Sequence, residues 1–234
     1  MRAEPERRQR LLQMAAGAAF LALAVVLVLI VVNSSGKGGD TGNIDGEAEV
    51  SRLLTGIPQR GMVLGDPKAP VELIEFGDLQ CPVCAGYAKE ILPSIIENQV
   101  KNGQAKIDFR NLTIIGDEST PAGAAALAAG EQGRGWNYLE LFYRNQGEER
   151  SGYVTDEFME AVAKAAGVKN LAKWNQDRRK LTGEVEKTTE EAGKLGYDAT
   201  PSFAVKGPST RGSMQLLGTP ETTGALEDAI EAAR

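Results

Sequence analysis

Histidine is absent from this 234-residue chain, and cysteine occurs only twice. The missing imidazoles remove the commonest general base and the commonest metal ligand of proteins. Two cysteines cannot complete a structural zinc site, which usually takes four cysteine or histidine ligands. Two cysteines are also too few for a small scaffold held together by disulfides, and a chain of this length can bury a core without them.

Negative charge exceeds positive charge beyond the first ten residues. The net charge of −6 includes +2 from residues 1–10, which hold four arginines and two glutamates, so the remainder carries −8. Nucleic-acid-binding proteins present clustered lysine and arginine to phosphates. We therefore expect no nucleic-acid partner.

Charge is missing altogether from residues 11–32, where Gln13 is the only strongly polar residue. A helix needs about 20 such residues to cross a bilayer. The arginines before this run predict a cytoplasmic tail at residues 1–10, a single-pass transmembrane anchor at 11–32 and an exported remainder in the cell membrane. A cleaved signal peptide is the alternative, but its apolar region is usually shorter and Val32-Asn33-Ser34 is a poor cleavage site.

Gly, Ser and Asp dominate the next segment, and we assign residues 33–61 to a flexible linker. A short helix between Glu47 and Arg60 is the alternative for its second half. The folded domain is predicted to span residues 62–234.

Short apolar runs and helical patterns alternate in that domain. Strands are expected at Met62–Gly65, Val71–Phe76, Lys106–Ile115, Ser202–Lys206 and Met214–Leu217. Helices are expected at Ala85–Val100, interrupted at Pro93, and from Thr219 to Ala233 with Pro220 in the first turn. The β-α-β order predicts a parallel pair of strands, and the last two strands predict an antiparallel hairpin.

The stretch between these halves, about residues 117–196, has helical patterns throughout. Thr155 is a predicted N-cap of one helix, and Gly167 is its predicted end. Apolar residues from Leu171 to Leu195 are expected to lie on one helical stripe. We interpret the whole stretch as a packed helical subdomain.

The two cysteines stand three apart in Cys81-Pro82-Val83-Cys84, between a predicted strand and a predicted helix. Copper(I) held by two thiolates is one possible use of such a pair. A structural disulfide would close only a tiny loop, so it would restrict the unfolded chain little. The spacing suits a redox pair better. At a helix N-terminus, backbone N–H groups and the helix dipole stabilise the Cys81 thiolate, which attacks, while the deeper Cys84 resolves the mixed disulfide.

Two more positions support redox chemistry. Glu75 shares a strand face with Val71 and Leu73, so it is either buried near the dithiol, where it could exchange the Cys84 proton, or solvated with them. Pro201 precedes a strand, where X-Pro bonds can be cis, and a cis turn would expose the Thr200 backbone to an extended peptide.

These features together resemble the thioredoxin superfamily, and more narrowly its DsbA-like branch. The resemblance rests on Glu75-Phe76, the Cys-Pro-Val-Cys turn, and Thr200-Pro201-Ser202-Phe203 before a hairpin. The segment GWNYLELFYRNQ (135–146) is similar to the insertion helix of the membrane-anchored bacterial members. The resemblance implies an α/β thioredoxin fold, with a helical subdomain inserted between a βαβ half and a ββα half.

The resemblance also implies an enzyme, a protein thiol–disulfide oxidoreductase that works without a cofactor or metal outside the cytoplasm. Glu75, Cys81, Cys84 and Pro201 would be its catalytic residues, with Pro201 as the cis-proline. Thr200, together with Pro82 and Val83, would contact substrate.

We expect a dithiol oxidase that acts on reduced or unfolded exported proteins. A quinone-linked membrane protein of the DsbB or vitamin K epoxide reductase type would reoxidise it. One departure affects the direction of electron flow: the strongest oxidants of the branch have histidine where this chain has Val83. A reductase or isomerase kept reduced by a membrane donor is therefore an alternative. A peptide chaperone or a copper(I) carrier on the same fold is another.

Overall fold

The computed structural model describes residues 43–234. The predicted cytoplasmic tail, the predicted anchor at 11–32 and the linker up to residue 42 lie outside the described residues. Between residues 43 and 234, none of the helices combines the length and the apolar character that crossing a bilayer requires.

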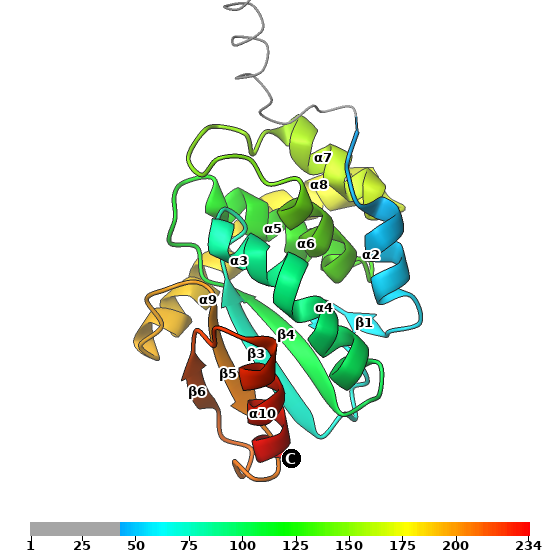
Figure 1. The fold of residues 1–234 in the computed structure, drawn as a ribbon. Coiled ribbons are helices and arrows are strands. Elements are labelled where there is room, and N and C mark those ends of the chain that lie inside the picture. The colour runs from blue at the N-terminus through cyan, green and yellow to red at the C-terminus, as the bar shows by residue number, and fades with distance from the viewer. Residues whose placement is uncertain (1–42) are drawn as a thin grey trace, which may run out of the picture. The chain divides into compact units, whose positions relative to one another are not determined.

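A six-stranded sheet forms the centre of the described part, in the order β1-β2-β4-β3-β5-β6 (Figure 1). Its central pair, β3 and β4, is parallel, and β3 also pairs antiparallel with β5. The predicted parallel pair and the predicted C-terminal hairpin of β5 and β6 are both confirmed. The strands are β1 (Gln59–Arg60), β2 (Val63–Leu64), β3 (Val71–Gly77), β4 (Ala105–Asn111), β5 (Ser202–Lys206) and β6 (Gln215–Gly218).

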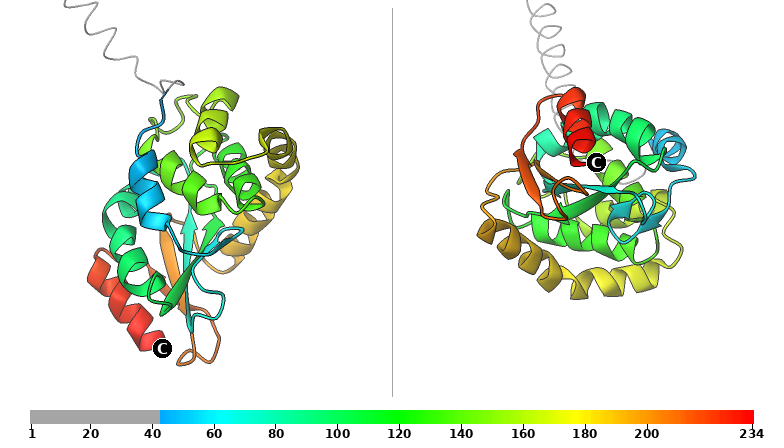
Figure 2. Two further views of the ribbon diagram at one scale, coloured as in Figure 1. Left: turned by 90° about the vertical axis from the view of Figure 1, so that its right-hand side faces the viewer. Right: turned by 90° about the horizontal axis from the view of Figure 1, so that it is seen from below.

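Helices cover both faces of the sheet (Figure 2). One face carries the helix that follows β3, together with α10 (Thr223–Ala233), which packs on β3 and β5. The other face carries α9 (Thr182–Lys194), whose Ala192 joins Ile74 and Phe76 of β3 in a small apolar cluster. Because β3 is covered on both sides, its residues are almost all buried.

The helix after β3 runs from Pro82 to Val100 but changes its winding three times. It consists of α3 (Pro82–Gly86), a π-helical turn η1 (Tyr87–Ile91), α4 (Leu92–Ile95) and a second π-helical turn η2 (Ile96–Val100). Pro93 has no N–H to donate, and wider turns accommodate such a break without ending the helix. The predicted interruption at Pro93 therefore takes the form of wider turns on either side of it.

The helical insertion follows β4, as predicted. Its members are α5 (Ser119–Gly130), α6 (Gly135–Arg144), α7 (Asp156–Ala165), α8 (Leu171–Lys180) and α9. The Thr155 hydroxyl caps α7 by accepting the Phe158 N–H, and Gly167 ends the helix with a φ of +78°. The single stripe expected from Leu171 to Leu195 is wrong, because the helix breaks at Leu181 and Leu195 is 50% exposed.

The folded part begins earlier than the predicted residue 62. Helix α2 (Glu47–Leu54) and strand β1 occupy positions assigned to the flexible linker. The helix packs on α6 and buries Val50, Leu53 and Leu54. The burial of this apolar face stabilises the helix. Of the two alternatives for residues 47–60, the helix is correct.

Two predicted boundaries also change. Strand β4 ends at Asn111 rather than Ile115, because the backbone N–H groups of Ile114 and Ile115 turn to the Asp78 carboxylate. Helix α10 begins at Thr223, so Pro220 is not in its first turn. The Thr222 hydroxyl caps it by accepting the Ala225 N–H.

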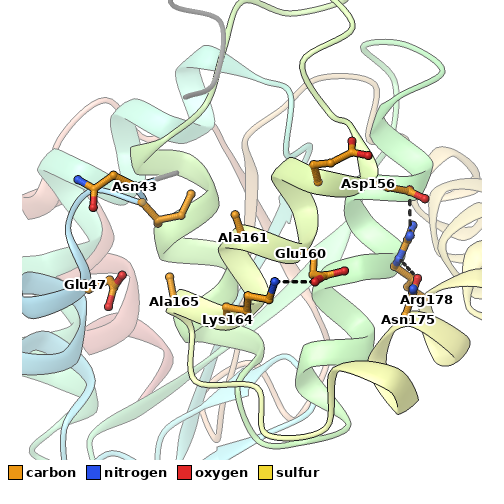
Figure 3. A pocket seen from close by; sticks show the side chains of 11 residues that line it. Asn43, Glu47, Asp156, Glu160, Ala161, Lys164, Ala165, Asn175 and Arg178 are labelled. Carbon is orange, nitrogen blue, oxygen red and sulfur yellow. Dashed lines mark hydrogen bonds and ion pairs between the residues drawn. The ribbon is translucent and has the colours of Figure 1, made fainter. Parts of the chain in front are cut away.

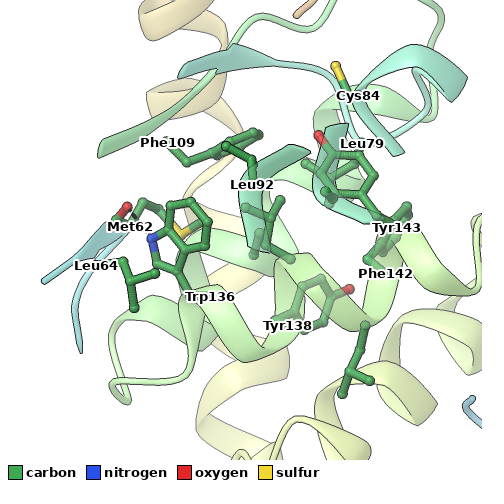
Figure 4. Close-up of a cluster of buried hydrophobic side chains, with 14 of the residues drawn as sticks. Met62, Leu64, Leu79, Cys84, Leu92, Phe109, Trp136, Tyr138, Phe142 and Tyr143 are labelled. Carbon is green, nitrogen blue, oxygen red and sulfur yellow. Dashed lines mark hydrogen bonds between the residues drawn. The ribbon is translucent and has the colours of Figure 1, made fainter. Parts of the chain in front are cut away.

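Aromatic side chains of α6 fill the core between the sheet and the insertion (Figure 4). Trp136 is fully buried, and its indole N–H donates to the Met62 carbonyl at 2.7 Å. Tyr143 lies at the other end of the cluster, near Leu79 and Cys84. Helix α6 therefore joins the insertion to the end of the sheet where the two cysteines lie.

Candidate active site

Strand β3 and the start of α3 bring the two cysteines together. Cys81 is the N-cap of α3, with Pro82 at the first helical position. The Cys84 backbone N–H points at the Cys81 sulfur, with 3.4 Å between N and Sγ. Both cysteines are free thiols. The site is thus in the reduced state, with Cys81 at the N-terminus of the helix as predicted.

The surroundings of Cys81 favour its thiolate. Its pKa falls from 9.0 to about 6, chiefly because the Cys84 thiol donates to it. Burial opposes this shift, while hydrogen bonds from the Thr200 side chain and from the backbone N–H groups of Val83 and Cys84 support it. A pKa near 6 makes Cys81 mostly thiolate at neutral pH, and a thiolate is the nucleophile of disulfide exchange.

The surroundings of Cys84 disfavour its thiolate. It is fully buried, and this burial raises the pKa of its thiol well above 9, helped by the nearby Cys81 and Glu75. The two thiols therefore differ in protonation at neutral pH. Cys84 needs a proton acceptor before it can attack a mixed disulfide.

Glu75 is a buried carboxyl group whose charge acts on that thiol. It is 0% exposed, and neither of its oxygens has a hydrogen-bond partner. Burial is the main reason that its pKa rises from 4.5 to about 8, and the charges of Glu140 and Cys81 add to the shift. Of the two alternatives for Glu75, the buried one is correct. A carboxyl group that titrates near neutral pH can both accept and return a proton.

The far end of the chain completes the site. The Thr200-Pro201 bond is cis, as predicted, and the Thr200 carbonyl oxygen lies 3.4 Å from the Cys81 sulfur. Thr219 holds this turn from the neighbouring segment, because its hydroxyl donates to the Pro201 carbonyl at 2.8 Å. Residues 119 positions apart in the sequence therefore meet at one thiol.

Pro82 and Val83 lie on the outside of the site. Both are exposed, and Val83 keeps 52% of its surface accessible. An exposed apolar side chain next to a reactive thiol offers a contact for a substrate chain, but it supplies no hydrogen-bond donor to the thiolate.

The sequence did not reveal which residues of the insertion form hydrogen bonds to the cysteine turn. Gln146, just after α6, donates its side-chain N–H to the carbonyls of Leu79 (2.6 Å) and Cys81 (3.2 Å). The Tyr143 hydroxyl donates to the Asp78 carbonyl at 3.2 Å. The only signal of these roles was that both residues lie in the GWNYLELFYRNQ segment that carried the resemblance.

Asp78 holds the turn between β3 and Cys81 from inside. Its carboxylate accepts the backbone N–H groups of Gln80, Ile114 and Ile115, each at 2.9 Å. The side chain is fully buried, and three donors compensate its lost hydration. The cysteine turn is therefore fixed to the loop after β4.

A separate cavity of about 660 Å³ lies between residues 43–47 and helices α7 and α8 (Figure 3). Ion pairs in its wall join Lys164 to Glu160 and Arg178 to Asp156, at 2.6 and 2.9 Å. Neither cysteine lines it. We interpret it as a solvated groove unconnected with the thiol chemistry.

Within residues 43–234, no three or more Cys, His, Asp or Glu side chains form a group that could hold a metal ion. The chemistry available at the site is that of two thiols with unequal acidity, a buried carboxyl group and a cis-proline turn. That set can carry out thiol–disulfide exchange.

Known proteins with similar sequences include members of the thioredoxin family and proteins named as disulfide bond formation proteins. The family described as Thioredoxin matches residues 58–230. The chain is 28% identical over 149 residues to the "Probable disulfide bond formation protein D" of Bacillus cereus, covering 62% of this chain and 69% of that protein. It is 31% identical over 150 residues to the "Disulfide bond formation protein D" of Bacillus subtilis, covering 61% and 66% of the two chains.

Among solved structures, oxidised BdbD from Bacillus subtilis superimposes with a TM-score of 0.64 at 24% sequence identity. The match covers 75% of this chain and 96% of that one. At this identity the similarity bears on the fold.

Proposed function

Because the chain belongs to the thioredoxin family, we propose that it is a thiol–disulfide oxidoreductase that forms disulfide bonds in exported proteins. The observation that carries the proposal is the inequality of the two thiols, with the pKa of Cys81 lowered to about 6 and that of Cys84 raised well above 9. Relatives named as disulfide bond formation proteins support the same activity.

In the proposed reaction the Cys81–Cys84 disulfide is attacked by a substrate thiolate at Cys81. A mixed disulfide forms, and Cys84 leaves as a thiolate that takes a proton from Glu75. A second substrate thiolate then attacks the substrate sulfur of the mixed disulfide, releasing an oxidised substrate and reduced Cys81. Two electrons pass from substrate to enzyme in each cycle.

The cis-proline turn and the exposed pair Pro82-Val83 are the proposed substrate contacts. Thr200 lies within hydrogen-bond reach of the reacting sulfur. An extended substrate chain laid along Thr200 would present its cysteine to Cys81. Pro201 stands directly before β5.

Oxidation rather than reduction is the proposed direction, since a lowered pKa of Cys81 favours the reduced enzyme and thus makes the disulfide a better oxidant. Each pKa unit is worth about 30 mV. An oxidase needs an electron acceptor, and we propose a quinone-linked membrane protein of the DsbB or vitamin K epoxide reductase type.

The proposed location is the outer side of the cell membrane. The uncharged run at residues 11–32 and the arginines before it support a single-pass anchor with a cytoplasmic N-terminus. Compartments outside the cytoplasm are also those in which disulfides persist. We propose that the folded domain extends from about residue 44 to the C-terminus.

Substitution of the resolving thiol tests the activity. In the producing cell, Cys84→Ser should trap covalent adducts between Cys81 and exported proteins, because the adduct can no longer be resolved from within. The adducts should disappear on reduction and in the double variant that also carries Cys81→Ser. A non-catalytic chaperone would give no covalent adducts. A copper(I) carrier would instead retain copper through both cysteines.

The steady-state redox form in the cell tests the direction. Rapid alkylation of the growing cells should find Cys81 and Cys84 mostly as the disulfide if the protein is an oxidase. A mostly reduced pair would favour the alternative, a reductase or isomerase supplied by a membrane donor.

A further inference from the structure

Besides Glu75 and the hydrogen-bonded Asp78, one more carboxyl group is fully buried in the described part of the chain, on the helix that contacts the cysteine turn. Glu140 of α6 is 0% exposed, like Glu75 of β3. Its Oε1 atom and both carboxyl oxygens of Glu75 have no hydrogen-bond partner. Buried carboxyl groups are normally paired, so two with free oxygens in one core call for a functional explanation.

Arg144 fixes the outer side of Glu140. Its Nη1 atom lies 2.5 Å from Glu140 Oε2, and its Nη2 atom lies 3.3 Å from Oε1 of Glu49 on α2. The Arg144 side chain is only 8% exposed. The turn before α2 closes over it, since a Cβ on Gly46 would come within 2.6 Å of Arg144 Cδ. The ion pair is therefore held in place by α2 and the turn before it.

The two carboxyl groups interact and do not titrate alike. Burial raises the pKa of Glu140 to about 7, with Arg144 opposing the shift. For Glu75 the pKa rises to about 8, and the charge of Glu140 is the largest cause after burial. Glu140 thus ionises first, and its charge then opposes ionisation of Glu75.

The remaining titratable groups around Glu75 are the two cysteines, Tyr143 of α6 and Tyr87 of η1. Burial raises the pKa of both tyrosines, so they stay neutral near pH 7. Around Glu140 the charged groups are Arg144 and Glu49. Asp78 is also buried near Tyr143, with its carboxylate bound by three backbone N–H groups. Of the charges outside the dithiol, that of Glu140 is the one that raises the pKa of Glu75.

We propose that Glu140 is a positioning residue that acts through Glu75. A single negative charge is shared between Glu75 and Glu140, and Arg144 fixes it on Glu140 while Glu75 holds a proton beside the dithiol. This role rests on the proposed thiol–disulfide exchange at Cys81 and Cys84.

The step it controls is resolution of a mixed disulfide at Cys81. The Cys84 thiol gives its proton to the Glu75 carboxylate, and the Cys84 sulfur attacks the Cys81 sulfur. The Cys81–Cys84 bond forms while the bond from Cys81 to the other sulfur breaks. The leaving sulfur departs with the electron pair and takes up the proton that Glu75 received. Atoms, charge and electrons balance without another reactant.

The test uses the full chain with Cys81 joined to a chromogenic aromatic thiol. Release of that thiol reports attack by Cys84 and is followed from about pH 5 to about pH 9. In the unsubstituted protein, release should rise with a half-point near the Glu75 pKa of about 8, and Glu75→Gln should remove this rise.

Glu140→Gln should move the half-point down by about one pH unit, because Glu75 then ionises without an opposing charge. Glu140→Asp keeps the charge and should leave the half-point near its original value. Arg144→Met should also move it down, since Glu140 without its partner stays protonated. Glu160→Gln is the matched control, an exposed carboxylate in an ion pair of the same spacing, and should change nothing.

An unchanged half-point in folded Glu140→Gln, with release still dependent on Cys84, would overturn the role of Glu140 and leave the exchange activity standing. An upward shift in Arg144→Met would also overturn it, because Arg144 would then act on Glu75 directly. Release no faster than in the Cys84→Ser variant would instead count against the proposed function itself.

Discussion

At the scale of single residues, Val83 leaves the position between the two thiols without a side-chain donor to Cys81. It sits between the thiols with 52% of its surface exposed. It adds a backbone N–H to the stabilisation of the Cys81 thiolate, but its side chain adds none. The pKa of about 6 lies in the upper part of the range ~3.5–7.5 found for such motifs.

Val83→His should therefore lower the pKa of Cys81 below 6, because an imidazole can donate to the thiolate or carry a positive charge beside it. Each unit of that fall should make the disulfide about 30 mV more oxidising. Titration of thiolate absorbance measures the pKa, and equilibration with glutathione measures the potential. Val83→Leu controls for side-chain size and should change neither.

Substitution of Gly77, at the end of β3, tests how tightly Phe109 and Tyr143 pack against this strand. A Cβ there would lie 2.6 Å from a ring carbon of Phe109 and 3.2 Å from the Tyr143 hydroxyl. Gly77→Ala should lower the free energy of unfolding by about 1–3 kcal/mol, through overpacking. Gly86→Ala is the control, because a Cβ there meets nothing within 4 Å. Equal stability of the two variants in denaturant unfolding would contradict the packing described.

At the scale of elements, α2 has a role that its sequence did not reveal. It lies against α6 and covers the Glu140–Arg144 pair. Leu54→Ala should cost about 2–5 kcal/mol in the free energy of unfolding, since the side chain is buried and its loss leaves a cavity. Ser51→Ala on the exposed face should cost less than 1 kcal/mol. A helix that was only loosely attached would give similar small effects for both.

Elements whose pattern is local could be predicted from the sequence. Strand β3, the α7 cap at Thr155 and the hairpin of β5 and β6 follow from short apolar runs, capping residues and turns. Boundaries set by distant partners could not. Strand β4 ends where Asp78 takes over the N–H groups that follow, and α2 forms because α6 offers it an apolar face.

The same distinction holds in the site. The dithiol, Glu75 and the cis-proline have motifs in the sequence, whereas Glu140 is one acidic residue in a helix of ordinary pattern. Only the fold puts its charge near Glu75, 65 positions earlier in the chain.

At the scale of the whole molecule, the buried carboxyl groups should shape stability against pH. Glu75 has its pKa raised from 4.5 to about 8, so between these values the folded state binds more protons than the unfolded state. Stability supplied by the bound proton is complete at low pH and is lost as the pH rises through this window, by up to about 1.4 kcal/mol per pH unit.

Glu75→Gln should flatten this slope and raise the free energy of unfolding near pH 7. Denaturant unfolding of the oxidised protein at several pH values measures it, since the disulfide removes the titration of the thiols. A slope that Glu75→Gln leaves unchanged would contradict the burial of an unpaired carboxyl group.

The proposed activity is tested most directly by transfer of the disulfide itself. The full chain, oxidised at Cys81–Cys84, is mixed with a reduced unfolded protein, and free thiols are counted in both partners with time. Two substrate thiols should disappear for each chain that becomes reduced, and substitution of Cys81 should abolish the transfer. Persistence of all substrate thiols beside an intact Cys81–Cys84 disulfide would contradict the account.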